Sequence, residues 1–291
     1  MCNKLSGRRN IMKTALALGT FDGVHKGHTA VLNLPHEYKK TAVVFSLPPK
    51  ALLSGRPLAL MTAEDKIKAL KVAGMDEVYT LDFGKVRDME ACDFLLFLKQ
   101  RFSPSLISCG FNYRFGKNAA GDTELLKAFC GENGIALKIS EPVKAGGVTV
   151  SSTEIRALLE NGETERANSL LSSPFSYTAK VIKGDMRGRT LGFPTANQKY
   201  PDVLVPVKFG VYRSSVLING NEYAGITDIG VRPTFKTDYI ISETFIKDFS
   251  GDIYGKEITV RLLRFIRGEK KFSSVQELKK QIAADIRSAD L

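Results

Sequence analysis

Apolar residues are spaced differently in the two halves of the chain. In the first half, short apolar runs alternate with amphipathic stretches whose apolar positions recur every three or four residues. Runs of the first kind are typical of buried strands, and stretches of the second kind are typical of helices. This alternation predicts a doubly wound, Rossmann-like α/β domain with a parallel sheet. The predicted strands are residues 13–19, 41–47, 76–83, 105–110 and 135–140, and the predicted helices are 62–74, 90–102, 121–134, 151–162 and 164–171.

The pattern changes after residues 172–175. Short strand-like runs separated by Gly, Asn, Asp and Pro follow, at residues 177–183, 210–218, 222–230, 241–249 and 257–267. Evenly spaced short strands predict an antiparallel barrel or sandwich. An amphipathic helix is expected over 273–289. We therefore expect two domains, at residues 12–172 and 175–291.

Composition is that of a globular protein able to bury two cores, with 43% hydrophobic and 25% charged residues among 291. No apolar run approaches the roughly 20 residues of a membrane helix. Residues 1–11 have the character of a loose basic extension, and Met12 is a candidate start. No apolar stretch behind this extension is long enough for a secretion signal, so we expect a cytoplasmic location. The four scattered cysteines fit a reducing compartment.

The net charge is +11, and the excess is spread over both halves. A basic balance attracts polyanions in general, so nucleotide phosphates satisfy it as well as nucleic acid does. A nucleic-acid-binding module without catalysis is one alternative. It would need aromatic residues interleaved with a basic stripe, and the dispersed aromatic residues argue against it.

The segment "GTFDGVHKGH", residues 19–28, holds two of the three histidines and directly follows the first predicted strand. Ligands of such sheets bind at the carboxyl ends of strands. If a helix begins near Val24, His25 and His28 share one face of its first turn, where unpaired N–H groups can seat a phosphate. Two imidazoles can then stabilise charge that develops on phosphate oxygens, and Gly27 lets a ligand approach the backbone. The alternatives are a pair of surface histidines and a metal site, for which no third ligand lies close in sequence.

The segment "KGDMRGRTLGFPTANQ", residues 183–198, mixes glycines with arginines. This composition predicts a loop that wraps phosphates, although the P-loop pattern is absent from the chain. If the chain is extended at Thr195 and Asn197, their side chains point the same way and offer two oxygen ligands to Mg²⁺. The alternative is a simple turn.

These segments carry a resemblance. "GTFDGVHKGH" resembles the nucleotidyltransferase signature G-x-F-D-G-x-H-x-G-H, and residues 13–291 resemble, in order, the bifunctional bacterial riboflavin kinase/FMN adenylyltransferase family. "GFNYRFGKNAAGD" (110–122) and "VSSTEIR" (150–156) resemble further motifs of its adenylyltransferase domain. The resemblance implies that FMN and ATP give FAD and pyrophosphate in the N-terminal domain, with His25 and His28 catalytic. The ATP-binding residues implied are Gly19, Phe21, Asp22, Gly23, Gly27, Asn112, Ser152, Thr153 and Arg156; from the residues alone, Ser152 and Thr153 could equally be helix caps.

The second half resembles the family's kinase domain, an antiparallel barrel that converts riboflavin and ATP to FMN. "GRTLGFPTAN" is similar to the flavokinase signature whose Thr and Asn bind Mg²⁺-ATP, and "SETFIKDFSGDIYGK" (242–256) places the general base on Glu243. "IRGEKKFSSVQEL" (266–278) is similar to a segment near the flavin, which makes Arg267 a weaker candidate contact. The kinase site implied comprises Glu243 with Gly184, Arg187, Gly188, Arg189, Thr195, Asn197 and Arg267, and the metal ligands are Thr195 and Asn197.

One stretch departs from the family pattern. Many relatives carry T-F-x-P-H-P after the second strand, whereas residues 44–50 here are "VFSLPPK", without the histidine. An alternative is therefore a riboflavin kinase with an impaired or altered adenylyltransferase domain. In either case we expect small-molecule partners only (ATP, riboflavin and FMN), with no nucleic acid or membrane, and a monomer or weak homo-oligomer.

Overall fold

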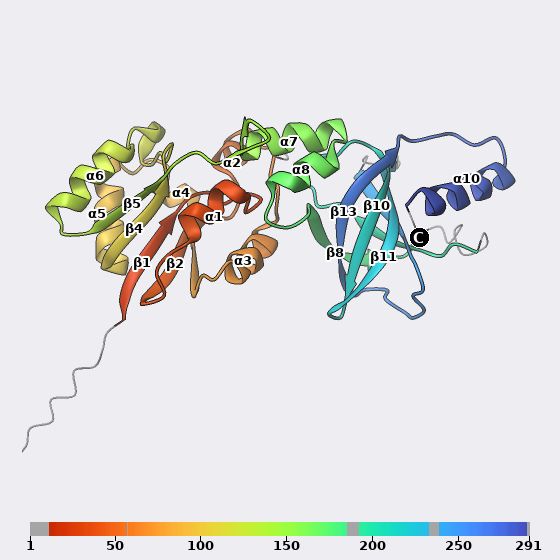
Figure 1. Ribbon diagram of the computed structural model, residues 1–291, viewed down its shortest axis with the longest axis horizontal. Coiled ribbons are helices and arrows are strands. Elements are labelled where there is room, and N and C mark those ends of the chain that lie inside the picture. The colour runs from red at the N-terminus through yellow and green to blue at the C-terminus, as the bar shows by residue number, and fades with distance from the viewer. Residues whose placement is uncertain (1–11, 57, 185–191, 233–238, 290–291) are drawn as a thin grey trace, which may run out of the picture. The chain divides into compact units, whose positions relative to one another are not determined.

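The computed structural model describes residues 12–56, 58–184, 192–232 and 239–289, which form two compact units (Figure 1). The first unit comprises the chain up to Thr20, together with His28–Ser46 and Ala69–Pro142. The second comprises Phe21–Gly27, Leu47–Lys68 and the chain from Val143 on. The segment that carries the histidine pair therefore contributes residues to both units.

A five-stranded sheet forms the centre of the first unit, in the order β3-β2-β1-β4-β5. Every pair of neighbouring strands is parallel, which confirms the predicted doubly wound sheet. Its strands are β1 (Lys13–Leu18), β2 (Tyr38–Phe45), β3 (Glu77–Leu81), β4 (Pro104–Gly110) and β5 (Ala136–Ser140). The helices that follow them are α1 (Lys26–Leu32), α4 (Phe83–Val86), α5 (Ala91–Phe102) and α6 (Thr123–Glu132).

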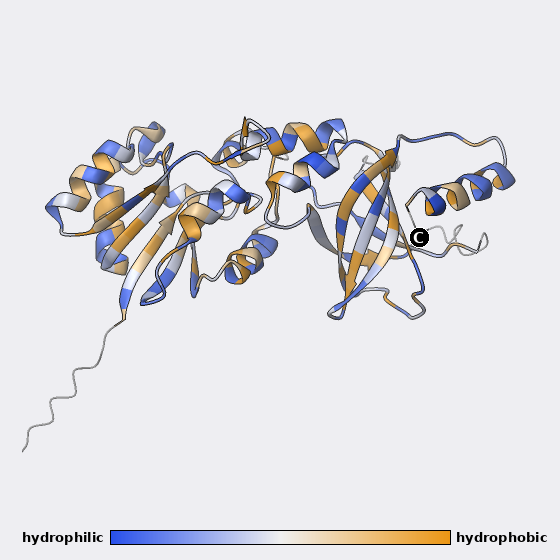
Figure 2. Cartoon of the chain, viewed as in Figure 1, coloured by the Kyte–Doolittle hydropathy of each residue, from blue (hydrophilic) through white to orange (hydrophobic). Residues whose placement is uncertain are grey.

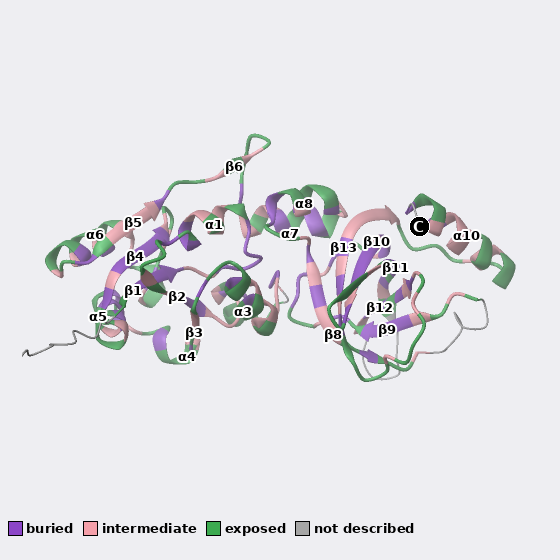
Figure 3. Cartoon of the chain, turned by 60° about the horizontal axis from the view of Figure 1, so that its bottom comes forward, coloured by how far each residue is buried: buried purple, intermediate pink, exposed green. Residues whose placement is uncertain are grey.

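Helices cover both faces of this sheet. Along β4, Ile107 and Cys109 belong to the buried cluster that includes apolar residues of α5 and α6. Ser108, which lies between them, donates its hydroxyl to the Val31 carbonyl of α1 at 2.8 Å. Because successive strand residues point to opposite faces, α1 lies on the face opposite α5 and α6. Four consecutive apolar residues of β1, Ala15 to Leu18, are buried, so both faces of this strand are covered. Figure 3 shows buried stretches in the central strands of this sheet.

The second unit contains a closed six-stranded barrel, in the order β10-β11-β12-β9-β8-β13. All pairs of neighbouring strands are antiparallel, as predicted. Because the sheet closes on itself, the structure is a barrel and not a sandwich. Hydrophilic and hydrophobic residues are mixed along the barrel strands (Figure 2). The strands are β8 (Ser176–Ile182), β9 (Thr195–Lys199), β10 (Gly210–Ile218), β11 (Asn221–Arg232), β12 (Tyr239–Ile246) and β13 (Glu257–Arg267).

Helices α7 (Ser152–Asn161) and α8 (Thr164–Leu170) pack onto this barrel. Apolar residues of both helices, including Ile155 and Leu170, share one buried cluster with barrel residues such as Tyr177 and Val260. This packing explains why the helices at the end of the α/β pattern belong to the second unit. The other elements here are α2 (Pro49–Ser54), α3 (Ala63–Val72), whose last residues belong to the first unit, the hairpin β6 (Lys144–Ala145) and β7 (Val148–Thr149), and α10 (Val275–Ser288).

Candidate active sites

Within the first unit, Gly19 directly follows β1, and Asn112 lies just after β4. Since β1 and β4 are parallel neighbours, their carboxyl ends meet at one edge of the sheet. His28 lies in the first turn of α1 and is partly buried, and Asn112 is exposed. The sheet therefore presents Gly19 and Asn112 at the edge where ligands of doubly wound sheets bind.

Helix α1 begins at Lys26, two residues later than predicted from the sequence, so His25 precedes the helix. The backbone is left-handed at Phe21 (φ 45°) and Val24 (φ 41°), which is incompatible with a helix starting there. His25 forms a backbone bridge with Leu171, and its side chain is buried. The interpretation of two surface histidines is therefore wrong for His25.

The imidazole of His25 lies against Gly27, because a Cβ at Gly27 would be 3.1 Å from two ring atoms of His25. Burial, together with a smaller effect of the nearby Arg156 guanidinium, lowers the pKa of His25 to about 4. His25 is therefore neutral at physiological pH, with one of its two ring nitrogens protonated.

Asp22 is a buried carboxylate that organises this part of the second unit. Its Oδ1 accepts the Leu60 N–H at 2.8 Å, and its Oδ2 accepts Nη2 of Arg156 at 2.6 Å. The Ser152 hydroxyl donates to the Asp22 carbonyl at 2.9 Å. Arg156 Nε donates to the carbonyl of Leu58. Three of the residues singled out in the sequence, Asp22, Ser152 and Arg156, are thus held together by direct hydrogen bonds.

The start of α7 is capped by Ser151, whose hydroxyl accepts the Glu154 N–H at 3.2 Å. Ser152 and Thr153 lie inside the helix, so the alternative that they are its caps is wrong. Thr153 is exposed in the first turn.

Two further residues of the motif have packing roles that the structure makes visible. Phe21 is fully buried. Gly23 has a φ of 87°, and a Cβ there would approach a Leu60 side-chain carbon to 2.8 Å. A side chain at this position would therefore crowd the Leu60 side chain and strain the left-handed backbone.

Lys66 on α3 is a charged residue near this cluster that sequence reasoning missed. Its side chain is buried, with 1% of the residue exposed. Burial lowers the pKa of Lys66 to about 8, while the Asp22 carboxylate raises it. A lysine in an amphipathic helix normally faces solvent, so the sequence carries no signal for this burial.

In the barrel, Thr195 and Asn197 lie on β9, so the chain is extended there and the interpretation as a turn is wrong. Asn197 Nδ2 lies 3.4 Å from the Thr195 hydroxyl oxygen, which places the two side chains on the same side. The Oδ1 atom of Asn197 is buried and has no hydrogen-bond partner among the described residues. A buried oxygen without a donor matches what a hard cation requires of a ligand.

Glu243 lies directly opposite Asn197 in the pairing of β12 with β9. Asp228 on β11 lies directly opposite Glu243 in turn. Residues opposite each other in adjacent strands share a face, so these three side chains form a row over three neighbouring strands of the barrel wall. Desolvation raises the pKa of Asp228 to about 6; the charge of Arg267 lowers this pKa, and the carboxylates of Glu243, Glu269 and Asp285 add to the rise. Asp228 was not expected from the sequence.

Gly184 lies against Asn197, because a Cβ at Gly184 would be 2.6 Å from the Asn197 side-chain amide. Of the other residues predicted in this glycine-rich segment, Arg187, Gly188 and Arg189 lie outside the described residues.

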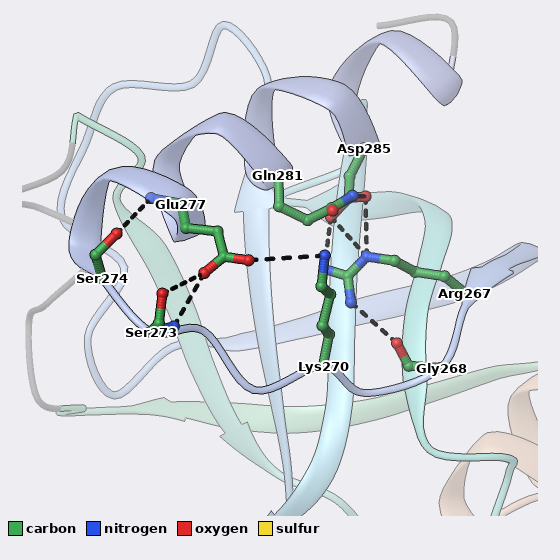
Figure 4. Close-up of polar contacts among 8 residues, drawn as sticks. All are labelled: Arg267, Gly268, Lys270, Ser273, Ser274, Glu277, Gln281 and Asp285. Atoms are coloured by element: carbon green, nitrogen blue, oxygen red, sulfur yellow. Dashed lines mark hydrogen bonds and ion pairs between the residues drawn. The ribbon is translucent and has the colours of Figure 1, made fainter.

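Arg267 holds α10 against the barrel (Figure 4). Its Nε and Nη2 donate to the Asp285 carboxylate at 3.0 and 2.7 Å, and Nη1 donates to the Gly268 carbonyl at 2.9 Å. Gln281 also donates to Asp285, at 2.9 Å. All three guanidinium nitrogens are therefore engaged within the protein.

Two family models match the chain, one described as FAD synthetase over residues 8–154 and the other as riboflavin kinase over residues 171–291. A bifunctional riboflavin kinase/FMN adenylyltransferase of Listeria monocytogenes is 36% identical over 287 residues, which cover 93% of this chain and 89% of the relative. The chain belongs to the bifunctional riboflavin kinase/FMN adenylyltransferase family. Another member of this family, from Escherichia coli K12, is 35% identical over 281 residues, covering 93% of this chain and 90% of its own length.

The whole fold is shared with a crystal structure of a Streptococcus pneumoniae protein described as a macrolide-efflux protein. It superposes with a TM-score of 0.86, covers 96% of this chain and 94% of that chain, and is 30% identical in sequence. In the described part of the present chain, no helix is both long enough and apolar enough to cross a bilayer.

Proposed function

We propose that this chain makes flavin cofactors in two steps. The barrel domain transfers the γ-phosphoryl group of ATP to riboflavin, which gives FMN and ADP. The N-terminal domain joins FMN to the adenylyl group of ATP, which gives FAD and pyrophosphate. The observation that carries the proposal is that both family models match this one chain, whose relatives bear both activities in their names. We assign the adenylyltransferase domain to residues 12–172 and the kinase domain to residues 175–291.

In the adenylylation step, an oxygen of the FMN phosphate attacks the α-phosphorus of ATP and pyrophosphate leaves. The neutral imidazole of His25 and that of His28 donate hydrogen bonds to phosphate oxygens as charge develops on them. Nε and Nη2 of Arg156 are fixed by Leu58 and Asp22, and we propose that the guanidinium held in this way donates from Nη1 to a phosphate oxygen. The other ATP-binding residues that we propose are Gly19, Phe21, Asp22, Gly23, Gly27, Asn112, Ser152 and Thr153.

In the kinase step, Glu243 accepts the proton of the ribityl 5′-hydroxyl while the 5′-oxygen attacks the γ-phosphorus of ATP. Asn197, with its buried Oδ1, and Thr195 fit the ligand chemistry of Mg²⁺. When bound, Mg²⁺ screens the charge of the transferred phosphoryl group. The position of Glu243 opposite Asn197 supports a base next to the metal-binding side chain. Gly184, Arg187, Gly188 and Arg189 complete the proposed phosphate-binding segment, and Arg267 is a weaker candidate contact of the flavin.

The departure at residues 44–50 raised the alternative of a kinase with an impaired adenylyltransferase domain. The match of the chain to the FAD synthetase model, together with its bifunctional relatives, favours the bifunctional interpretation over this alternative. We further propose that the protein works in the cytoplasm, as a monomer or weak homo-oligomer, on small molecules and without nucleic acid.

The test is to incubate the purified protein with riboflavin and Mg-ATP and to resolve the flavins by chromatography. We expect FMN to appear first and FAD to follow. FMN without FAD would restore the alternative, and neither product would contradict both versions. Omitting Mg²⁺ and adding a chelator should abolish FMN formation.

A further inference from the structure

Helix α1, which carries one of the two proposed catalytic histidines in its first turn, ends in carbonyls that its own backbone does not satisfy. The last turn of any helix leaves carbonyls without partners inside the helix. The Leu34 N–H, which would continue α1 by bonding the Ala30 carbonyl, donates instead to the Leu32 carbonyl at 2.9 Å. The next residue is Pro35, which has no N–H for the Val31 carbonyl. Donors for these carbonyls therefore have to come from outside the helix.

Two neighbouring strands of the sheet supply such donors. The buried hydroxyl of Ser108 on β4 donates to the Val31 carbonyl at 2.8 Å. The Lys138 ammonium of β5 donates to the Ala30 carbonyl at 2.9 Å and to the Asn33 carbonyl at 2.8 Å. Ser108 and Lys138 lie directly opposite each other in the pairing of β4 with β5, so both side chains lie on the face that carries α1. The positive charge of Lys138 also complements the dipole at this end of the helix.

We propose that Lys138 and Ser108 are positioning residues for His28 in the adenylylation step, acting through the carbonyls of α1. The inference rests on the proposed adenylyltransferase function. The helix has only seven residues, and His28 precedes Val31 by three, which is about 4.5 Å along the helix axis. Because so short a helix moves as one body, hydrogen bonds at its last turn also set the place of the imidazole at its first turn.

Apolar packing does not fix the helix in the same way. The buried residues of α1 are Val31 and Leu32, and hydrophobic contact holds them against the sheet without a preferred direction. Hydrogen bonds require a defined geometry between donor and acceptor, so those from Ser108 and Lys138 oppose sliding of the helix along the strands. A catalytic group misplaced by about 1 Å loses much of its effect on the rate. We assign Ser108 and Lys138 themselves no contact with ATP or FMN.

The experiment measures the steady-state adenylylation of FMN by Mg-ATP in the full chain. For Lys138→Met we expect kcat to fall about tenfold and the KM for ATP and for FMN to change less than about twofold, because a donor to the transition state is misplaced. Lys138→Arg keeps the charge and several donors, and its kcat should lie within about threefold of that of the unsubstituted protein. The matched control is Lys99→Met on α5, on the other face of the sheet. The Lys99 ammonium donates to the Asn133 side chain at 2.6 Å, and its loss should leave adenylylation unchanged.

A second readout follows the position of His28 itself. The chain has only three histidines, so each imidazole signal in a proton–nitrogen NMR spectrum is assigned by its loss when that histidine is substituted. We expect the ring signals of His28 to shift in Lys138→Met and to stay in place in Lys99→Met. If Lys138 served stability alone, Lys138→Met would lower the urea midpoint and leave both kcat and the His28 signals of the folded protein unchanged.

An unchanged kcat in Lys138→Met, or a lower kcat with the His28 signals unmoved, would overturn this inference and leave the proposed function standing. Absence of FAD formation by the unsubstituted protein would instead contradict the proposed function itself. If Lys138→Met does not fold, Ser108→Ala decides, because it removes the other side-chain hydrogen bond to α1 with little change in volume. A kcat lowered a few-fold at unchanged KM in Ser108→Ala supports positioning, whereas an unchanged kcat there overturns it.

Discussion

The Gly184 backbone touches the side chain of Asn197 so closely that a Cβ at Gly184 would lie 2.6 Å from the asparagine amide. Real Cβ atoms do not approach other atoms this closely, so any larger residue must displace Asn197. The same amide carries the buried oxygen that fits a metal ligand. Gly184 is thereby linked to the proposed Mg²⁺ site through space, which the glycine-rich composition alone did not indicate.

Gly184→Ala should therefore impair the kinase reaction selectively. We expect riboflavin phosphorylation to fall at least about tenfold and the Mg²⁺ concentration for half-maximal rate to rise, because the displaced amide no longer presents its oxygen. Adenylylation of supplied FMN should be unchanged. Gly131→Ala is the control, since a Cβ there meets nothing within 4 Å. An unaltered Mg²⁺ requirement in Gly184→Ala would argue against Asn197 as a ligand.

Arg156→Ala should lower kcat/KM for adenylylation about 100-fold, or roughly 2–3 kcal/mol, because a charged hydrogen bond to phosphate is lost. Arg156→Lys should recover little, since an ammonium cannot satisfy Leu58, Asp22 and a phosphate in a fixed fork. The kinase activity should persist. The control is Arg166→Ala, which removes an exposed arginine that forms an ion pair with Glu163. Equal losses in the Arg156 and Arg166 variants would contradict the assignment.

The buried His25 should make the protein less stable in acid. In the unfolded chain, histidine binds a proton below its ordinary pKa of about 6.5, whereas burial lowers the pKa of His25 to about 4 in the fold. The unfolded state therefore binds more protons between these two values, and the free energy of unfolding falls as pH drops through that window. His25→Asn should remove about 2–3 kcal/mol of the stability lost between pH 7 and pH 4. Urea unfolding at pH 7, 5 and 4 measures it, and an identical pH dependence in both proteins would count against a buried neutral imidazole.

Asp228 should shape the pH dependence of the kinase. Its pKa of about 6 means that it becomes negative as pH rises through 6. A negative charge opposite Glu243 strengthens that carboxylate as a proton acceptor, so the phosphorylation rate should rise over this range. In Asp228→Asn we expect this rise to be smaller and the rate at pH 8 to drop a few-fold. The measurement is a pH–rate profile of riboflavin phosphorylation at saturating riboflavin. An identical profile in both proteins would contradict an effect of the Asp228 charge on Glu243.

Much of the fold follows from residue patterning. The five predicted strands of the parallel sheet and five barrel strands all occur, with ends shifted by a few residues. The missing strand, β9, begins after Pro194 and consists largely of polar residues, so nothing in its own pattern indicated burial. It becomes buried because closure of the barrel pairs it on both sides, with β8 and β12.

For the sites, the sequence motifs identified individual residues but not the contacts between them. The motifs pointed to Asp22 and Arg156, but not to the hydrogen bond between them, which depends on residues 134 positions apart. Lys66 was missed because a charged residue in an amphipathic helix is normally solvated. Asp228 was missed because its place opposite Glu243 depends on the register of β11 with β12. The late start of α1 also escaped, since a left-handed Val24 is a property of the folded loop and not of valine.

We propose that this one chain holds two separate ATP-dependent sites. The most direct measurement compares Glu243→Gln and His28→Ala, each supplied in parallel with riboflavin or with FMN, together with Mg-ATP. Glu243→Gln should form no FMN from riboflavin yet convert supplied FMN to FAD, and His28→Ala should form FMN and stop there. Loss of both products in either variant, with the protein still folded, would contradict two independent sites.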